Sequence, residues 1–93
     1  MTVSRNDARS RYELDVDGRV AGILVYRHGD EVLTMVHTEV GDEWEGQGLG
    51  STLVRGALDD VRERGLKIRP LCPFVAAYLR RHPEYEDLVS SAA

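Results

Sequence analysis

The sequence predicts an α+β domain with a compact mixed sheet of about four strands and two main helices. Three observations support this prediction. Apolar residues alternate in three stretches between residues 11 and 40, a glycine-rich turn then leads into a helical pattern, and a short apolar run precedes a second, proline-led helix. The first three strands are expected to be antiparallel. A strand–helix–strand order implies a right-handed crossover, so the third and fourth strands are expected to be parallel.

Alternating apolar residues and the turn residues between them predict three antiparallel strands. Residues 11–16 alternate apolar and charged side chains, which is typical of a half-buried strand near a sheet edge. Asp17-Gly18 is a type I′ hairpin signal. Residues 20–26 are apolar on both faces, which indicates a central strand covered on both sides. Residues 32–40 form the third strand.

The crossover and the second helix follow from spacing and from caps. Apolar residues recur at helical spacing over residues 52–64, and Gly65 suits the position after the last helical residue. Residues 66–71 form the short fourth strand. Pro73 suits the first position of a helix, which places Cys72 at its N-cap, and Pro83 ends this helix. The apolar stripe of the second helix is Phe74, Val75, Tyr78 and Leu79.

Length and composition limit the protein class. The 93 residues suffice for one small domain, expected over residues 11–89, with flexible tails at 1–10 and 90–93. A net charge of −4 argues against a nucleic-acid partner. No apolar run is long enough to cross a membrane, and no leader-like stretch opens the chain.

Cysteine and histidine usage points to the compartment and argues against a metal. One cysteine cannot form an internal disulfide, which favours a reducing cytoplasm. One cysteine and three scattered histidines match no zinc-ligand spacing. We therefore expect no metal and a cytoplasmic location.

The glycine-rich stretch from Glu43 to Ser51 joins a strand to a helix N-terminus, where free amides and the helix dipole favour an anion. Glycines allow close approach because they lack Cβ. We expect six residues to offer amides to a pyrophosphate: Gly46, Gln47, Gly48, Leu49, Gly50 and Ser51. A dinucleotide fingerprint fails because Ser51 stands at the last glycine, and a Walker loop fails because no lysine precedes the Ser51-Thr52 pair.

The stretch Glu45-Gly46-Gln47-Gly48-Leu49-Gly50 resembles the acetyl-CoA-binding motif Gln/Arg-x-x-Gly-x-Gly/Ala of the Gcn5-related N-acetyltransferase superfamily. Gly48 and Gly50 match, whereas Glu45 replaces the usual Gln or Arg, and its carboxylate should repel a pyrophosphate. Residues 37–40 and the segment Cys72-Pro73-Phe74-x-x-x-Tyr78 resemble a narrower group, the small stand-alone YjdJ-like acetyltransferases.

The resemblance implies that acetyl-CoA is a substrate and that an amine, from a small molecule or a protein, accepts the acetyl group. Pantetheine would lie where residues 34–40 and 66–71 splay apart, paired with backbone groups of Thr38 and Val40. The Val40 amide would stabilise the oxyanion. Helices that shape the acceptor pocket in larger relatives are missing here. The acceptor site is therefore expected to be open and shallow, or completed by a partner such as a second copy of the chain.

Four side chains are candidates for the chemistry. Cys72 at a helix N-cap could carry the acetyl group in a ping-pong route, or it could simply fill the corner between strand and helix. Glu39 and His37 share one strand face, and either could be the general base or a solvated rim residue. Tyr78 could protonate the CoA thiolate or serve as a core aromatic. The competing function is a non-catalytic CoA-binding or protein-interaction module.

Overall fold

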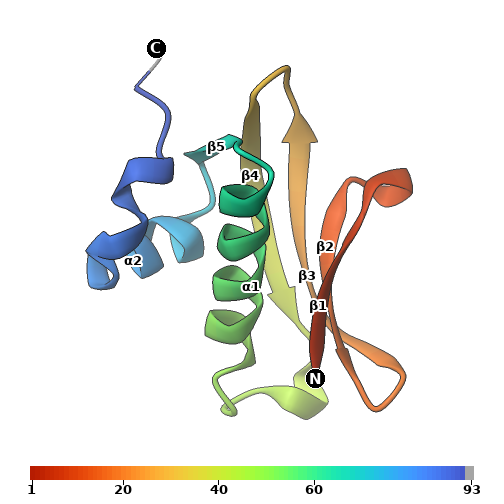
Figure 1. Ribbon diagram of the computed structural model, residues 1–93. Coiled ribbons are helices and arrows are strands. Elements are labelled where there is room, and N and C mark those ends of the chain that lie inside the picture. Colours follow the sequence, from red (N-terminus) through yellow and green to blue (C-terminus); the bar gives the residue numbers. More distant parts are fainter. Residues whose placement is uncertain (92–93) are drawn as a thin grey trace.

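The computed structural model describes residues 1–91 and shows a five-stranded sheet in the order β1-β2-β3-β4-β5 with two α-helices (Figure 1). The strands are β1 Thr2–Asn6, β2 Arg11–Val16, β3 Arg19–His28, β4 Val32–Val40 and β5 Lys67–Pro70, and the helices are α1 Leu49–Glu63 and α2 Pro73–Arg81. β1 to β4 are antiparallel and β4 pairs in parallel with β5. The antiparallel order of β2, β3 and β4 and the parallel pairing of β4 with β5 were predicted. Within the described chain, no helix is long and apolar enough to cross a membrane.

The hairpin and cap predictions are confirmed. Asp17 and Gly18 both have positive φ, 52° and 81°, as a type I′ turn requires. At the end of α1, Gly65 has φ 70° and donates to Arg62 O, while Leu66 N–H donates to Val61 O at 3.0 Å. This pair of bonds is a Schellman motif, which satisfies carbonyls that the helix would leave free.

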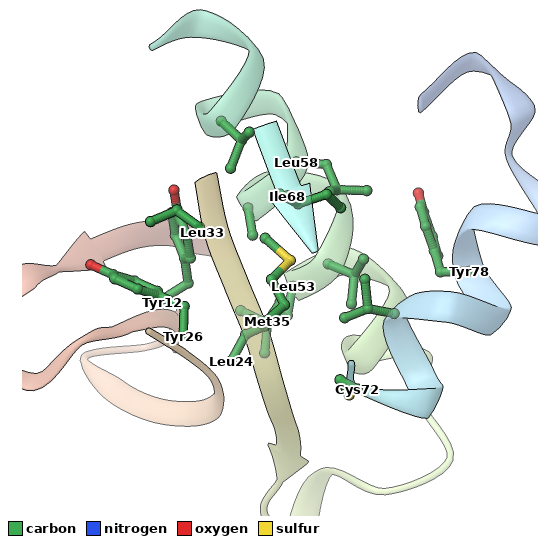
Figure 2. Packing of buried hydrophobic residues seen from close by; sticks show 14 of the residues in the cluster. Tyr12, Leu24, Tyr26, Leu33, Met35, Leu53, Leu58, Ile68, Cys72 and Tyr78 are labelled. Carbon is green, nitrogen blue, oxygen red and sulfur yellow. The ribbon is translucent and has the colours of Figure 1, made fainter. Parts of the chain in front are cut away.

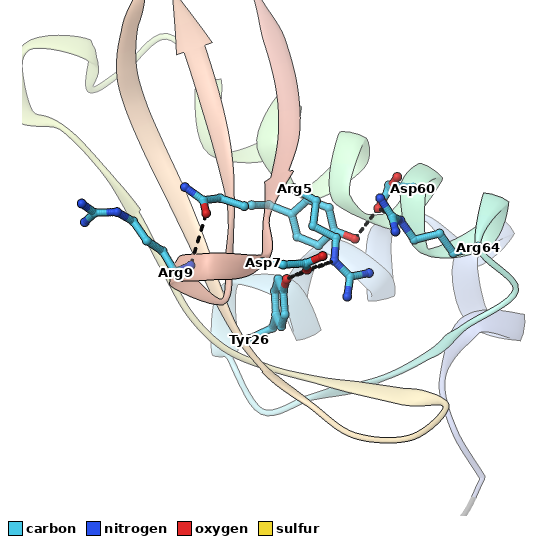
Figure 3. Close-up of polar contacts among 8 residues, drawn as sticks. Arg5, Asp7, Arg9, Tyr26, Asp60 and Arg64 are labelled. Atoms are coloured by element: carbon cyan, nitrogen blue, oxygen red, sulfur yellow. Dashed lines mark hydrogen bonds and ion pairs between the residues drawn. The ribbon is translucent and has the colours of Figure 1, made fainter.

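The expectation of a flexible N-terminal tail is wrong for Thr2–Asn6. This segment forms β1, a strand that was not predicted, and it makes β2 an inner strand of the sheet. The strand is short, but its alternate side chains have partners. Val3 packs against Gly56 of α1, so closely that the glycine has no room for a Cβ. Arg5, with a side chain only 5% exposed, lies over the Tyr26 ring and donates to its hydroxyl at 3.0 Å (Figure 3).

The Val3–Gly56 contact gives a test of how firmly β1 is docked. A Cβ at Gly56 would lie 2.6 Å from Val3 Cβ, so Gly56→Ala should lower the free energy of unfolding by about 1–3 kcal/mol, measured by urea denaturation. In a Val3→Gly background the clash is gone, and the same change should instead stabilise by up to about 1 kcal/mol through helix propensity. An equal effect in both backgrounds would contradict this docking.

Both α-helices pack on one face of the sheet, which carries the core residues Leu24, Leu33 and Met35. Figure 1 shows α1 beside β4, with its axis in roughly the same direction as β3 and β4. The prediction that residues 20–26 are covered on both sides is therefore wrong. Ile23 and Val25 point to the other face and are only half-buried, because no described helix covers that outer face.

After α2 the chain returns to the sheet. The segment Pro83–Leu88 forms a 3₁₀ helix, and Val89 then makes an isolated parallel bridge to Ile68 of β5. Ser90 N–H donates to Ile68 O at 2.8 Å, so Ser90 is held against β5 rather than free as expected for the C-terminal tail. Ala92 and Ala93, the rest of that predicted tail, lie outside the described residues.

Candidate functional site

A gap between β4 and β5 is the central feature of the site. β5 pairs with β4 only from Val32 to Met35, and Cys72 N–H then donates to Met35 O at 2.9 Å. Beyond this bond the chain turns into α2, whereas β4 continues to Val40. Of the last five residues of β4, residues 37–40 therefore have ladder partners in β3, and none of the five has a partner in β5.

The free backbone groups of this segment belong to Thr38 and Val40. Gly41 N–H donates to Ala21 O at 2.8 Å, and Gly22 is opposite Val40 in the register. In an antiparallel ladder this arrangement turns the backbone groups of Glu39 toward β3 and those of Thr38 and Val40 toward the gap. The register skips one residue of β4 between Met35 and His37, a bulge that bends the strand where it leaves β5.

The glycine-rich loop closes one end of the gap. α1 begins at Leu49, with Gly48 as its N-cap at φ 72° and no side-chain cap. The first N–H groups of a helix have no acceptor within the helix, and here they belong to Leu49, Gly50 and Ser51. Of the six residues predicted to hold a pyrophosphate, five line a cavity of about 280 Å³, which we call the loop cavity; Gln47 does not line it.

Val40 brings the strand and the loop together, since it lines the loop cavity beside Gly46 and Gly48. One of the two strand residues predicted to bind the cofactor, Val40, therefore lies beside the predicted loop residues, whereas Thr38 does not line this cavity. The site can hold an anionic group at the helix end and an extended chain along β4. Within residues 1–91, no three His, Cys, Asp or Glu side chains gather to hold a metal.

Two aromatic residues, Phe74 and Trp44, line the loop cavity. Phe74 was predicted in the buried stripe of α2, but it is 44% exposed and its ring faces Gly50, where a Cβ would lie 2.8 Å from the ring. It is the second residue of α2, a position that turns it away from the core and toward the loop. Trp44 lines the same cavity and packs on Gly41, as a lid over the turn would.

Glu45 also lines the loop cavity, so an acidic residue lies beside the predicted anion site. Glu45→Gln should tighten CoA binding about fivefold in calorimetry at low salt, the size expected for one exposed charge pair. The gain should shrink as salt is raised. Glu63→Gln, the same charge change at the far end of α1, should leave the affinity unchanged. Equal affinities for all three proteins would show that Glu45 does not repel the cofactor.

Cys72 lies at the floor of the gap. It is the N-cap of α2, as predicted, and its thiol is 3% exposed. Its Sγ is 3.3 Å from Thr38 Oγ1, so the thiol contacts a residue whose backbone faces the gap. Figure 2 shows Cys72 at the start of α2. Cys72 thus touches the strand predicted to hold pantetheine, and it also fills the strand–helix corner.

Glu39 and His37 share one face of β4, as predicted. Both side chains are exposed on the outer face, whereas Thr38 between them points to Cys72 on the helix face. Glu39 lines a second cavity of about 340 Å³ on the outer face, and His37 does not line it. The thiol and the two candidate bases therefore lie on opposite faces of the same strand.

Tyr78 does not join these residues. It lies further along α2, well apart from Cys72 in Figure 2, and stacks on His82 with ring centroids 4.1 Å apart. It lines two hollows between α1 and α2, but not the loop cavity. Burial raises the pKa of Tyr78. The neighbouring Tyr85 has its pKa raised to about 12 by burial and by its hydrogen bond to Asp59.

A β4–β5 pair that stops pairing beside a glycine-rich helix N-terminus defines a class of α+β domain. A family model described as GCN5-related N-acetyl-transferase matches residues 11–88. The chain belongs to this family.

Relatives of known sequence and structure agree with this assignment. Protein NATD1 of Mus musculus is 29% identical over 83 residues, which cover 87% of this chain and 76% of NATD1. Protein NATD1 of Gallus gallus is 34% identical over 62 residues, 66% of this chain and 56% of that protein. The solution structure of a GCN5-like protein from Staphylococcus aureus has a TM-score of 0.70 at 26% identity and covers 99% of this chain and 90% of that one.

A more distant structure supports the fold alone. The ribosomal-protein-S18-alanine N-acetyltransferase of Escherichia coli matches 76% of this chain and 49% of its own, with a TM-score of 0.62 at 20% identity.

Proposed function

We propose that this protein is an acetyl-CoA-dependent N-acetyltransferase that transfers the acetyl group to an amine. One observation carries the proposal. The backbone groups of Thr38 and Val40 that β3 leaves free face the gap, and Val40 lines the loop cavity together with the residues whose free amides begin α1. A pyrophosphate on the helix N-terminus and a pantetheine arm along β4 use these two sets of groups together.

In this mechanism the two substrates approach β4 from opposite faces of the sheet. Acetyl-CoA enters from the helix face, where the loop cavity lies, and the amine approaches from the outer face, where Glu39 is exposed. Glu39 takes a proton from the ammonium group, and the neutral nitrogen attacks the thioester carbon. The Val40 N–H stabilises the oxyanion, and collapse of the tetrahedral intermediate breaks the C–S bond. The nitrogen loses its second proton as the amide forms, and the departing CoA thiolate takes up a proton to leave as the free thiol.

Glu39 is preferred to His37 as the general base because Glu39 lines the second cavity, on the outer face of the sheet, together with Val40. The position of Tyr78 gives no support to a role in protonating the thiolate, because Tyr78 lines neither the loop cavity nor the second cavity.

Two routes are open to the acetyl group: direct transfer, and transfer through an acetyl thioester on Cys72, in which the thiolate displaces CoA before the amine attacks. The buried thiol beside Thr38 is within the site but on the face opposite Glu39. Intact mass measured after incubation with acetyl-CoA separates the routes. An acetyl adduct that is absent in Cys72→Ala supports the covalent route, whereas an adduct that persists in that variant contradicts it.

The second candidate is a non-catalytic module that binds CoA or a protein partner, and Glu45 at the loop cavity favours it. Calorimetry with acetyl-CoA and CoA, followed by an amine panel, distinguishes the two functions. Binding with turnover of an amine supports the enzyme, and binding without turnover supports a CoA-binding module. Absence of binding at high micromolar ligand contradicts both CoA-based functions.

A further inference from the structure

The second cavity lies on the outer face of the sheet, between the start of β3 and the end of β4. We call it the outer hollow. It measures about 340 Å³ and is lined by Val20, Ala21, Gly22, Ile23, Glu39, Val40, Gly41 and Asp42. It shares Val40 with the loop cavity, so the two cavities meet at the strand residue that faces the gap. A ligand in the outer hollow would thus reach the gap from the side opposite the loop.

The lining has two chemical characters. Val20, which is 48% exposed, and the half-buried Ile23 supply apolar surface from β3. Of the described residues that line the hollow, only Glu39 and Asp42 carry a charge, and both are acidic. The surface therefore combines an apolar strip with two carboxylates, three residues apart and at most about 10 Å along the chain.

Neighbouring basic groups do not neutralise these carboxylates. Arg19, which precedes the hollow in β3, pairs with Glu43 and lies over the Trp44 ring, 4.9 Å from its centroid. No ion pair joins Glu39 or Asp42 to a basic side chain within residues 1–91. The hollow thus keeps its negative charge.

We propose that the outer hollow binds the amine acceptor, and that the acceptor is a small aliphatic amine with a second cationic group. The reacting nitrogen lies by Glu39 and Val40, the carbon chain lies on Val20 and Ile23, and the distal cation lies by Asp42. This inference rests on the proposed function for the identity of the ligand as the acceptor. An acceptor with an anionic tail is excluded by repulsion from Asp42.

Three probes of equal chain length test the charge requirement: 1,5-diaminopentane, pentylamine and 5-aminopentanoate. Each is titrated by NMR into the protein, with and without bound CoA, while the amide signals of Ile23, Val40 and Asp42 are followed. The diamine should bind about fivefold more tightly than pentylamine at low salt, and 5-aminopentanoate should bind most weakly. The preference should fall as salt screens the pair.

The variant Asp42→Asn should remove the preference, bringing the ratio of diamine to monoamine affinity close to one. Asp30→Asn is the matched control, because it makes the same charge change in the turn at the other end of β3 and β4 and should leave the ratio unchanged. If acetylation occurs, the ratio of kcat/KM values for the two amines should follow the same pattern.

Failure of this inference can be told apart from failure of the proposed function. Equal binding of the three probes, tighter binding of 5-aminopentanoate, or diamine shifts centred away from the hollow would overturn the cationic acceptor, whether or not CoA binds. Absence of CoA binding together with diamine shifts at Asp42 would overturn the acetyltransferase and keep the cation-binding hollow. Acetylation of pentylamine alone would keep the enzyme and overturn the second cationic group.

Discussion

Gly48→Val should raise the dissociation constant for CoA at least about 100-fold, measured by calorimetry. Gly48 caps α1 at φ 72°, next to the free amides of Leu49 and Gly50. A β-branched side chain would project from the cap beside these amides and would also strain the left-handed conformation. Loss of hydrogen bonds to a charged group costs about 1.5–3 kcal/mol each, and 100-fold corresponds to about 2.7 kcal/mol.

Gly65→Val is the matched control for backbone strain. Gly65 has φ 70°, and, as at Gly48, an added Cβ would meet nothing within 4 Å. It follows the last turn of the same helix, so the two variants should lose similar stability, about 1–2 kcal/mol. Only Gly48→Val should lose CoA. Equal retention of CoA by both variants would show that the pyrophosphate does not lie on the loop, and Gly48→Ala offers a milder test if the valine variant does not fold.

Glu39→Gln should lower kcat about 10²–10⁴-fold for the amine that is turned over best, because it removes the proposed general base. The affinity for acetyl-CoA should change less than about twofold, because the Glu39 side chain is on the outer face and the loop cavity is on the other. The pH–rate profile should lose its rise on the acidic side, since the titrating group that accepts the proton is gone.

His37→Gln provides the comparison on the same face of the same strand. His37 is exposed but does not line the outer hollow, so its replacement should lower kcat much less than replacement of Glu39. A large loss in His37→Gln with a small one in Glu39→Gln would assign the base to His37. Small losses in both variants would indicate that the amine arrives already neutral and that neither residue is the base.

These expectations depend on a part of the fold that was predictable from local pattern. β2 and β4 have the predicted bounds, Asp17 and Gly18 adopt the predicted turn, and Cys72 caps α2. Each of these features is set by residues close together in the chain: alternation, a glycine with positive φ, or a proline at the first helical position. The loop that precedes α1 belongs to the same group, because its glycines define a helix N-terminus.

Contacts between distant segments decided what local pattern could not show. β1 contains only one apolar residue that points to the core, Val3. This segment is nevertheless a strand, because Val3 packs against Gly56 and Arg5 lies over the Tyr26 ring. The missing helix layer on the outer face leaves Ile23 half-buried, which alternation within one strand cannot reveal. Phe74 follows the apolar pattern of α2 but lies on the glycine loop, because Gly50 leaves room for its ring.

The sequence by itself determined the strand–loop–helix junction, the Cys-led second helix and the residues that could hold acetyl-CoA, because each depends on neighbours in the chain. The tertiary structure alone decided on which face of the sheet each candidate residue lies. It turned Thr38 and Cys72 to the helix face and Glu39 to the outer face, and it placed Tyr78 away from both. The physical reason is that the β4 bulge and the end of β5 pairing set which way each group points.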